Sequence, residues 1–244
     1  MFKPGDKLNP YDPAALDLGD EGVQQRLTSG TSPMTPQLME MLRDPAQRER
    51  FLNMMKEDAA ERERTGETPE QQILREKREW AQADAKSAQF KIMGNKAFRD
   101  GDYKRAFVIY SACMHLSPHE PLYPLNRAAV ALKLKMYETA VEDASMALGN
   151  GNFNRPKALF RRGQARCFLG ELSKAEEDCE KALTLQPGDR VVVEQIAEVN
   201  RLRGLPADER DAWVSAQAKT TPVDLFGTGG LKRQVEEVLG QSLN

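Results

Sequence analysis

The chain has 244 residues, of which 30% are charged and 7% aromatic, and its formal net charge is -2. A nearly balanced charge gives no global electrostatic attraction to nucleic acid or to an anionic membrane. No apolar run approaches the roughly 20 residues that span a bilayer, and the start, MFKPGDKLNPYDP, lacks the apolar stretch of a secretory signal. We therefore expect a cytoplasmic protein with no nucleic-acid partner and no membrane insertion.

The cysteines and histidines do not indicate a metal or a cofactor. Cys113, Cys167 and Cys179 share no CxxC spacing, and an odd number of cysteines without a signal sequence favours free, buried thiols in a reducing compartment. His115 and His119 straddle a predicted helix end. Ordinary polar roles are favoured there over a metal site, so we expect neither a metal nor a cofactor.

The first 66 residues form two predicted regions. Residues 1–35 contain four prolines, many glycines and little apolar periodicity, which predicts a mostly disordered segment. Residues 36–66 are expected to form a pair of short helices. The second helix has a clear start, because Asp44 can cap it, Pro45 suits its first position and Gln47 completes a capping box.

A charged helix is predicted over residues 67–86, leading into the next segment. Thr68, Pro69 and Gln71 form its start signal. The helix then continues through the charged sequence EQQILREKREWAQADAKSAQF.

The segment 87–203 repeats itself with a period of 34 or 35 residues. Small residues recur in three sets, which are Gly94, Ala128 and Gly163; Ala106, Ala140 and Ala175; and Cys113, Ala147 and Ala182. This period is typical of tetratricopeptide repeats, in which each unit is a pair of antiparallel helices that approach closely at small side chains. We predict units at about 87–120, 121–155 and 156–189, followed by a helix over 190–203 that caps the last unit.

The remaining residues, 204–244, are predicted to be a linker and a short helix. GLPADERDAW has weak periodicity, and TTPVDLFGTGG is rich in turn residues. FGTGG follows no predicted strand, so a phosphate-binding loop is not expected. The helix LKRQVEEVLG is amphipathic, with Leu231, Val235, Val238 and Leu239 on one side.

Five polar residues lie on the first helices of the three units, which line the concave face of a tetratricopeptide superhelix. They are Lys91 and Asn95 in the first unit, Asn126 in the second, and Lys157 and Arg161 in the third. Lysine supplies a point charge, arginine a fork that fits a carboxylate, and asparagine an amide that can hold a peptide backbone. This set would suit a chain end with two neighbouring carboxylates. Arg162 points in another direction from Arg161, so we expect it to be a surface charge.

Three stretches carry a resemblance to a known family: KIMGNKAF (91–98), LYPLNRAA (122–129) and KALFRRGQA (157–165). They resemble the carboxylate-clamp tetratricopeptide domains of Hsp70 and Hsp90 co-chaperones. In that family the clamp consists of Lys and Asn on the first unit, Asn on the second, and Lys and Arg on the third. The resemblance implies that the five residues named above bind the C-terminal EEVD peptide of Hsp70 or Hsp90. All five occur in register.

The flanking segments resemble known proteins over shorter lengths. PQLMEMLRDPAQRERFLNMM is loosely similar to the Asp-Pro helical motifs of some co-chaperones, but a docking or dimerising element is favoured there. FLNMMKEDAAERER and DLFGTGGLKRQVEEVL are similar to a tetratricopeptide protein of ciliary dynein-arm assembly. That resemblance adds the cilium to the expected locations.

Together these observations predict an all-α protein with a three-repeat superhelix, a capping helix and helical extensions at both ends. Ser145 and Ser173 lie near no His and Asp arrangement, and we find no nucleophile–base pair, so we expect no enzyme. The predicted function is an adaptor that binds the C-terminus of Hsp70 or Hsp90 and links the chaperone to a client or assembly through its terminal helices. The alternative is a structural component or assembly factor of a large complex such as the axoneme, whose groove is filled by a neighbour or by residues 205–244.

Overall fold

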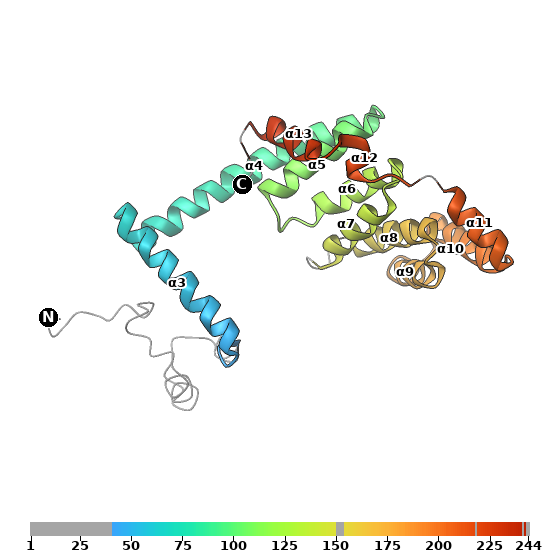
Figure 1. Ribbon diagram of the computed structural model, residues 1–244, viewed down its shortest axis with the longest axis horizontal. Helices are drawn as coiled ribbons and strands as arrows, with labels where there is room; N and C mark the ends of the chain where they lie inside the picture. Colours follow the sequence, from blue (N-terminus) through green and yellow to red (C-terminus); the bar gives the residue numbers. More distant parts are fainter. Residues whose placement is uncertain (1–40, 150–153, 218, 241, 243–244) are drawn as a thin grey trace. The chain divides into compact units, whose positions relative to one another are not determined.

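The computed structural model describes residues 41–149, 154–217, 219–240 and 242, and every regular element in these ranges is a helix (Figure 1). The predicted all-α fold is therefore confirmed. The chain divides into two compact units, residues 1–77 and 78–244, with the boundary inside one long helix. We describe each unit separately. The segment predicted to be disordered, 1–35, lies outside the described residues.

The first unit contains α3 (Pro45–Thr65) and the beginning of α4 (Pro69–Arg99). The predicted cap of α3 is present, since Asp44 accepts hydrogen bonds from the Ala46 amide (2.9 Å) and from Gln47 (3.2 Å). Arg75 of α4 donates to Glu67 at 3.1 Å and lies 3.5 Å from Glu61 of α3. Most of the other short helix predicted before α3 falls on residues outside the described ranges.

The second unit contains the repeats, and consecutive helices pack against each other (Figure 1). The three pairs are the end of α4 with α5 (Tyr103–Leu116), α6 (Leu122–Lys133) with α7 (Tyr137–Gly149), and α8 (Arg155–Leu169) with α9 (Leu172–Leu185). The capping helix is α10 (Arg190–Arg203), which contacts α9 and α8. The small residues lie where the helices meet: a Cβ atom added at Gly163 would be 2.8 Å from the Cys179 sulfur.

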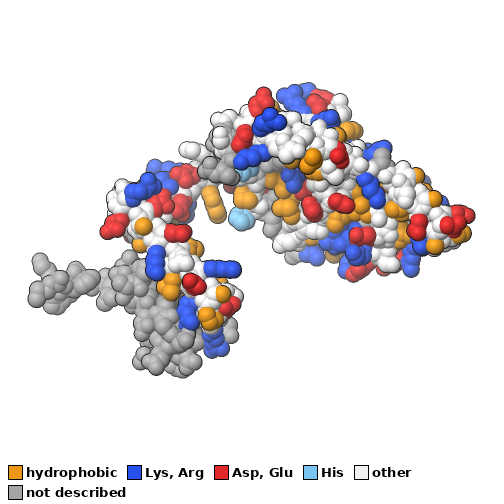
Figure 2. Space-filling view, in the orientation of Figure 1, with side chains coloured by type: hydrophobic (Ala, Val, Ile, Leu, Met, Phe, Trp, Pro, Cys, Tyr) orange, Lys and Arg blue, Asp and Glu red, His pale blue; other side chains and the backbone are white. Residues whose placement is uncertain are grey.

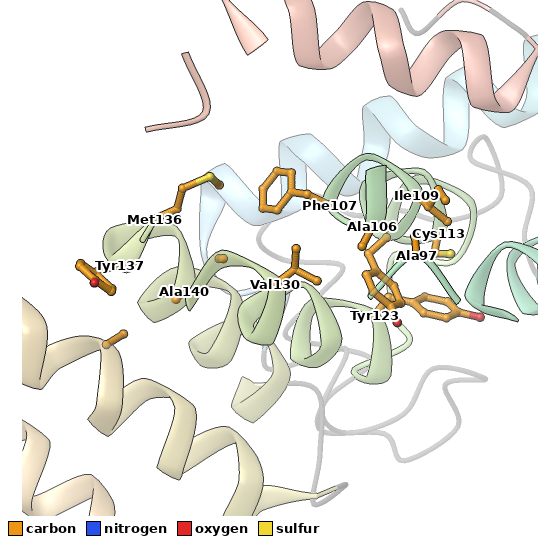
Figure 3. Packing of buried hydrophobic residues seen from close by; sticks show 13 residues of the cluster. Ala97, Ala106, Phe107, Ile109, Cys113, Tyr123, Val130, Met136, Tyr137 and Ala140 are labelled. Atoms are coloured by element: carbon orange, nitrogen blue, oxygen red, sulfur yellow. The ribbon is translucent and has the colours of Figure 1, made fainter. Parts of the chain in front are cut away.

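The first repeat differs from the others in how much of its second helix is buried. Eight consecutive residues of α5, 106–113, are buried, whereas α7 and α9 bury only one stripe each. Phe107 lies on one side of α5, and Ile109 and Cys113 lie on the other (Figure 3). A helix that is apolar on all sides needs partners on all sides, so α5 must be covered by more than its own repeat.

Two buried ion pairs recur in the second and third repeats. Arg127 donates to both carboxylate oxygens of Asp143, at 2.6 and 2.8 Å. Arg162, 35 residues later, donates in the same way to Asp178, at 2.7 and 2.9 Å. Each arginine also donates to a serine on the second helix of the preceding repeat. These pairs join the two helices of a repeat and connect it to the repeat before.

The expectation that Arg162 is a surface charge is therefore wrong. Its side chain is only 19% exposed, and its carboxylate partner, Asp178, is 1% exposed. Arg166, one turn further along α8, donates to the same carboxylate at 2.7 Å. The physical reason is that a guanidinium can enter the interior of a helix pair when a carboxylate there accepts its hydrogen bonds.

The segment predicted to be a linker contains two further helices, α11 (Ala207–Ala216) and α12 (Pro222–Phe226). The Trp213 ring of α11 stacks on Phe168 of α8, with 6.1 Å between the ring centroids. A capping box between Thr221 and Asp224 starts α12. The linker prediction was wrong for these two helices. A segment with weak apolar periodicity can still be helical when it packs against another helix, and local periodicity does not reveal such contacts.

The predicted C-terminal amphipathic helix is present as α13 (Gly230–Leu239). Its apolar side packs on α5, where Val235 and Leu239 are each only 4% exposed. In Figure 1 the chain runs back from α11 to α4 and α5, so that α12 and α13 lie beside the first repeat.

The three cysteines are free and buried, as predicted. Burial raises the pKa of Cys113 and of Cys179 to about 12, and that of Cys167 to about 11. An unfolded chain would release these protons near pH 9, while the folded protein keeps them. The free energy of unfolding is therefore fully retained below pH 9 and falls as the pH rises towards 12.

We expect unfolding in urea to require less denaturant at pH 10 than at pH 8, with a loss of about 1 kcal/mol for each buried thiol. A Cys179→Ala variant is the control, because it should lose less stability between the two pH values than the wild type does. Equal sensitivity to pH in the two proteins would contradict the role of the thiols.

Candidate peptide-binding site

The five residues predicted to bind carboxylates lie on the first helices of the three repeats. They form the candidate clamp: Lys91 and Asn95 on α4, Asn126 on α6, and Lys157 and Arg161 on α8. Lys157 is exposed, and the other four are half-buried. Helices α6 and α8 contact each other, so residues far apart in the sequence are presented by neighbouring helices.

A tyrosine that the sequence analysis missed lies beneath the candidate clamp. The Tyr110 hydroxyl donates to Asn95 Oδ1 at 2.6 Å, and its side chain is almost fully buried. Burial raises the pKa of Tyr110 to about 12, although the charge of Arg161 and a hydrogen bond with Asn126 act in the opposite direction. Tyr110 is therefore protonated at neutral pH, and its hydroxyl lies close enough to Asn126 of α6 and Arg161 of α8 for both to lower its pKa.

The contact with Tyr110 also orients Asn95. Because the Asn95 carbonyl oxygen accepts the tyrosine hydrogen bond, its amide nitrogen is left to donate to a ligand. The repeat glycine makes room for this arrangement, since a Cβ atom at Gly94 would be 3.1 Å from the Tyr110 ring. That spacing, a glycine followed 16 residues later by a tyrosine, was the available signal in the sequence.

Arg161 is held in place by the neighbouring repeat. Its Nη1 donates to the main-chain carbonyl of Leu125 at 2.5 Å, next to Asn126 on α6. Burial lowers the pKa of Arg161, but a guanidinium stays charged at neutral pH. This hydrogen bond occupies one nitrogen of the guanidinium group and fixes the orientation of its other N–H groups.

Among the described residues, the three cations of the candidate clamp have no acidic partner. No carboxylate in the described parts of the chain lies within 4.0 Å of the charged nitrogens of Lys91, Lys157 or Arg161. On the face seen in Figure 2, Lys and Arg side chains lie among Asp and Glu side chains. The contrast is sharpest on α8, where Arg162 is neutralised by a carboxylate and Arg161 is not. Cations without an internal partner are suited to an anionic ligand.

The described residues show neither a metal site nor a membrane-spanning helix. Within them, no group of three or more His, Cys, Asp or Glu side chains could hold a metal ion. His115 and His119 are both exposed. The helices of the described ranges include none with the length and apolar character that crossing a membrane requires.

Comparison with known proteins agrees with the repeat architecture. Residues 156–189 match the tetratricopeptide repeat family. The chain is 35% identical to RNA polymerase II-associated protein 3 of Homo sapiens over 151 residues, which are 62% of this chain and 22% of that protein. It is 37% identical to dynein axonemal assembly factor 4 of Mus musculus over 130 residues, which are 50% of this chain and 31% of that protein.

A solved structure extends the comparison. The first TPR of Spaghetti (RPAP3), bound to the HSP90 peptide SRMEEVD, is 31% identical with a TM-score of 0.48, and the match covers 50% of this chain and 96% of that chain. The chain spans less than a third of the length of either curated relative. The three helix pairs follow the predicted period, and the third of them coincides with the segment that matches the tetratricopeptide repeat family.

Proposed function

We propose that this protein is a non-catalytic adaptor that binds the C-terminal EEVD peptide of Hsp70 or Hsp90 and links the chaperone to a client or an assembly. The observation that carries the proposal is the candidate clamp, in which three cations and two amides lie on the first helices of successive repeats. The part of the chain that the structure describes offers these cations no acidic partner. Its binding residues are Lys91, Asn95, Asn126, Lys157 and Arg161.

The chemistry of an EEVD terminus fits this arrangement. Its last residue carries two carboxylates, one on the side chain and one at the chain end, and each can accept charge-assisted hydrogen bonds. The two asparagines can hold the extended backbone between them. A short peptide bound in this way would have a micromolar Kd, or about -8 kcal/mol, and its affinity would fall as salt is added.

A second candidate function follows from the relative named dynein axonemal assembly factor 4. In it, the chain is a structural component or assembly factor of a large complex such as the axoneme, and a neighbouring protein fills the groove. The described part of the tail packs on the outer side of α5, which favours a neighbour over the tail as the occupant. The proposed location is the cytoplasm for the first function and the cilium for the second.

Titration calorimetry tests the proposal directly. A peptide ending in EEVD should bind at moderate salt, and the same peptide with an amidated C-terminus should bind much more weakly, because it lacks one of the two terminal carboxylates. Lys157→Glu and Arg161→Glu should each abolish binding. Absence of binding to the wild type, or binding by both charge-reversed variants with the affinity of the wild type, would refute the clamp. Parallel titrations with intact Hsp70 and intact Hsp90 then identify the preferred chaperone.

The tyrosine beneath the candidate clamp gives a finer prediction. Tyr110→Phe removes the hydroxyl that orients Asn95 and leaves the ring in place. Loss of one neutral hydrogen bond predicts an affinity lower by roughly 3- to 10-fold, measured by the same titration. Tyr103→Phe, in the first turn of the same helix, is the control and should bind like the wild type. If Tyr110→Phe bound the peptide with unchanged affinity, the Tyr110 hydroxyl would not contribute to peptide binding.

A further inference from the structure

The outer side of α5 is covered by the C-terminal strap, which we define as residues 220–239. Phe226 of the strap stacks on Phe107, with 5.8 Å between the ring centroids and 25° between the planes. Val235 and Leu239 pack against Val108 and Ala112 of α5. This strap explains why eight consecutive residues of α5 are buried.

The strap is fastened at both ends, to the second repeat at its start and to the first repeat at its end. At its start, the Thr220 amide donates to the Lys135 carbonyl between α6 and α7, at 3.1 Å. At its end, Lys86 of α4 donates to the Leu239 carbonyl at 2.7 Å. An ammonium group at this position satisfies a free carbonyl at the C-terminus of α13 and interacts favourably with the helix dipole.

The two helices joined by the strap also carry the first part of the candidate clamp. Helix α4 contains Lys91 and Asn95, and α5 contains Tyr110, which donates to Asn95. Successive residues of a helix are turned by about 100°, so Val108 and Ala112 lie on the side of α5 opposite Tyr110. Helix α13 of the strap and Tyr110 therefore lie on opposite sides of the same helix, while Phe226 contacts Phe107, which is turned by only about 60° from Tyr110.

The first repeat needs such support more than the others. Each unit of a solenoid contacts only its neighbours, and the first repeat has another repeat on one side only. A small rotation of α5 would move the Tyr110 hydroxyl away from Asn95. Asn95 lies on α4, whereas Asn126 and Arg161 lie on α6 and α8, so its position relative to them depends on how the helices pack. Affinity for a ligand that contacts all three repeats depends on holding these helices in one arrangement.

We propose that the C-terminal strap is a positioning element of the peptide-binding site: it holds α4 and α5 so that Lys91 and Asn95 meet the ligand together with the residues of α6 and α8. This inference rests on the proposed function. It assigns Phe226 and Leu239 as positioning residues that do not touch the ligand. Coupling of this kind is reciprocal, so a bound peptide should in turn stabilise the strap.

Phe226→Ala in the full chain is the first test, measured by calorimetry with an EEVD-ending peptide. We expect its affinity to fall by roughly 5-fold or more, with Phe226→Leu restoring much of the loss. Val223→Ala is the matched control, because Val223 lies on the same short helix but is 59% exposed. It should bind like the wild type. Circular dichroism of each variant reports whether the helices are retained.

Hydrogen exchange of the wild type provides a second test that needs no variant. Saturating peptide should slow exchange of the amides in 231–239, which a purely structural strap would not show. If the wild type binds but Phe226→Ala binds equally well or more tightly, or if exchange in 231–239 is unchanged by peptide, the strap proposal fails while the proposed function stands. If the wild type does not bind, both fail.

Discussion

Arg161→Ala is expected to weaken binding of an EEVD-ending peptide by roughly 10- to 100-fold. Arg161 is tethered to another repeat, since its Nη1 donates to the Leu125 carbonyl of α6. The loss of charge-assisted hydrogen bonds from a partly desolvated group costs about 1.5–3 kcal/mol, and each 1.4 kcal/mol is about tenfold in affinity. Calorimetric titration at two salt concentrations measures the loss of affinity and how much of that loss depends on salt, which is its electrostatic part.

Two further variants separate the shape of Arg161 from its charge. Arg161→Lys keeps the charge but loses the fork, and should recover only part of the affinity. Lys181→Ala removes one positive charge from the exposed surface of α9, where Lys181 pairs with Glu177, and should leave binding unchanged. Equal losses for Lys181→Ala and Arg161→Ala would mean that net charge, and not the candidate clamp, governs binding.

Asp178→Ala is expected to produce the largest loss of stability in the repeats. Asp178 is 1% exposed and accepts hydrogen bonds from both Arg162 and Arg166, which are 19% and 17% exposed. Removing it leaves two guanidinium groups without their carboxylate, and breaking a buried pair in this way costs about 3–5 kcal/mol. Urea unfolding followed by circular dichroism measures the change.

The neighbouring residue supplies the control. Glu177 precedes Asp178 on α9, but its side chain is 59% exposed and pairs only with Lys181 in the described structure. Glu177→Ala should therefore change the free energy of unfolding by less than about 1 kcal/mol. If Asp178→Ala were no more destabilising than Glu177→Ala, the buried ion pair would not be a main contributor to stability.

Much of the repeat domain could be predicted from local patterns. A period of 34 or 35 residues, with small residues at fixed offsets, predicted three helix pairs and their close contacts, as seen at Gly163. Capping signals at Asp44 and Thr68 placed the starts of α3 and α4. These features are readable because helix spacing and capping depend on residues within a few turns of each other.

Contacts between helices were harder to predict. Arg161 and Arg162 are adjacent in the sequence, yet Arg161 donates to a main-chain carbonyl of α6 and Arg162 is buried against Asp178. The sequence did contain a signal, since Arg127 and Asp143 each recur 35 residues later. A recurring pair of opposite charges within a repeat indicates a shared internal position, which the surface-charge interpretation overlooked.

By itself, the sequence determined the all-α class, the number of helix pairs and the capping helix, and it predicted the residues of the candidate clamp. Only the tertiary structure decided that Tyr110 lies beneath Asn95 and that α11 and α12 are helices. It also decided that the tail packs on the outer side of α5, away from the candidate clamp. The physical reason is that periodicity reports which face of a helix is apolar, whereas the partner of that face is chosen by packing between segments distant in the chain.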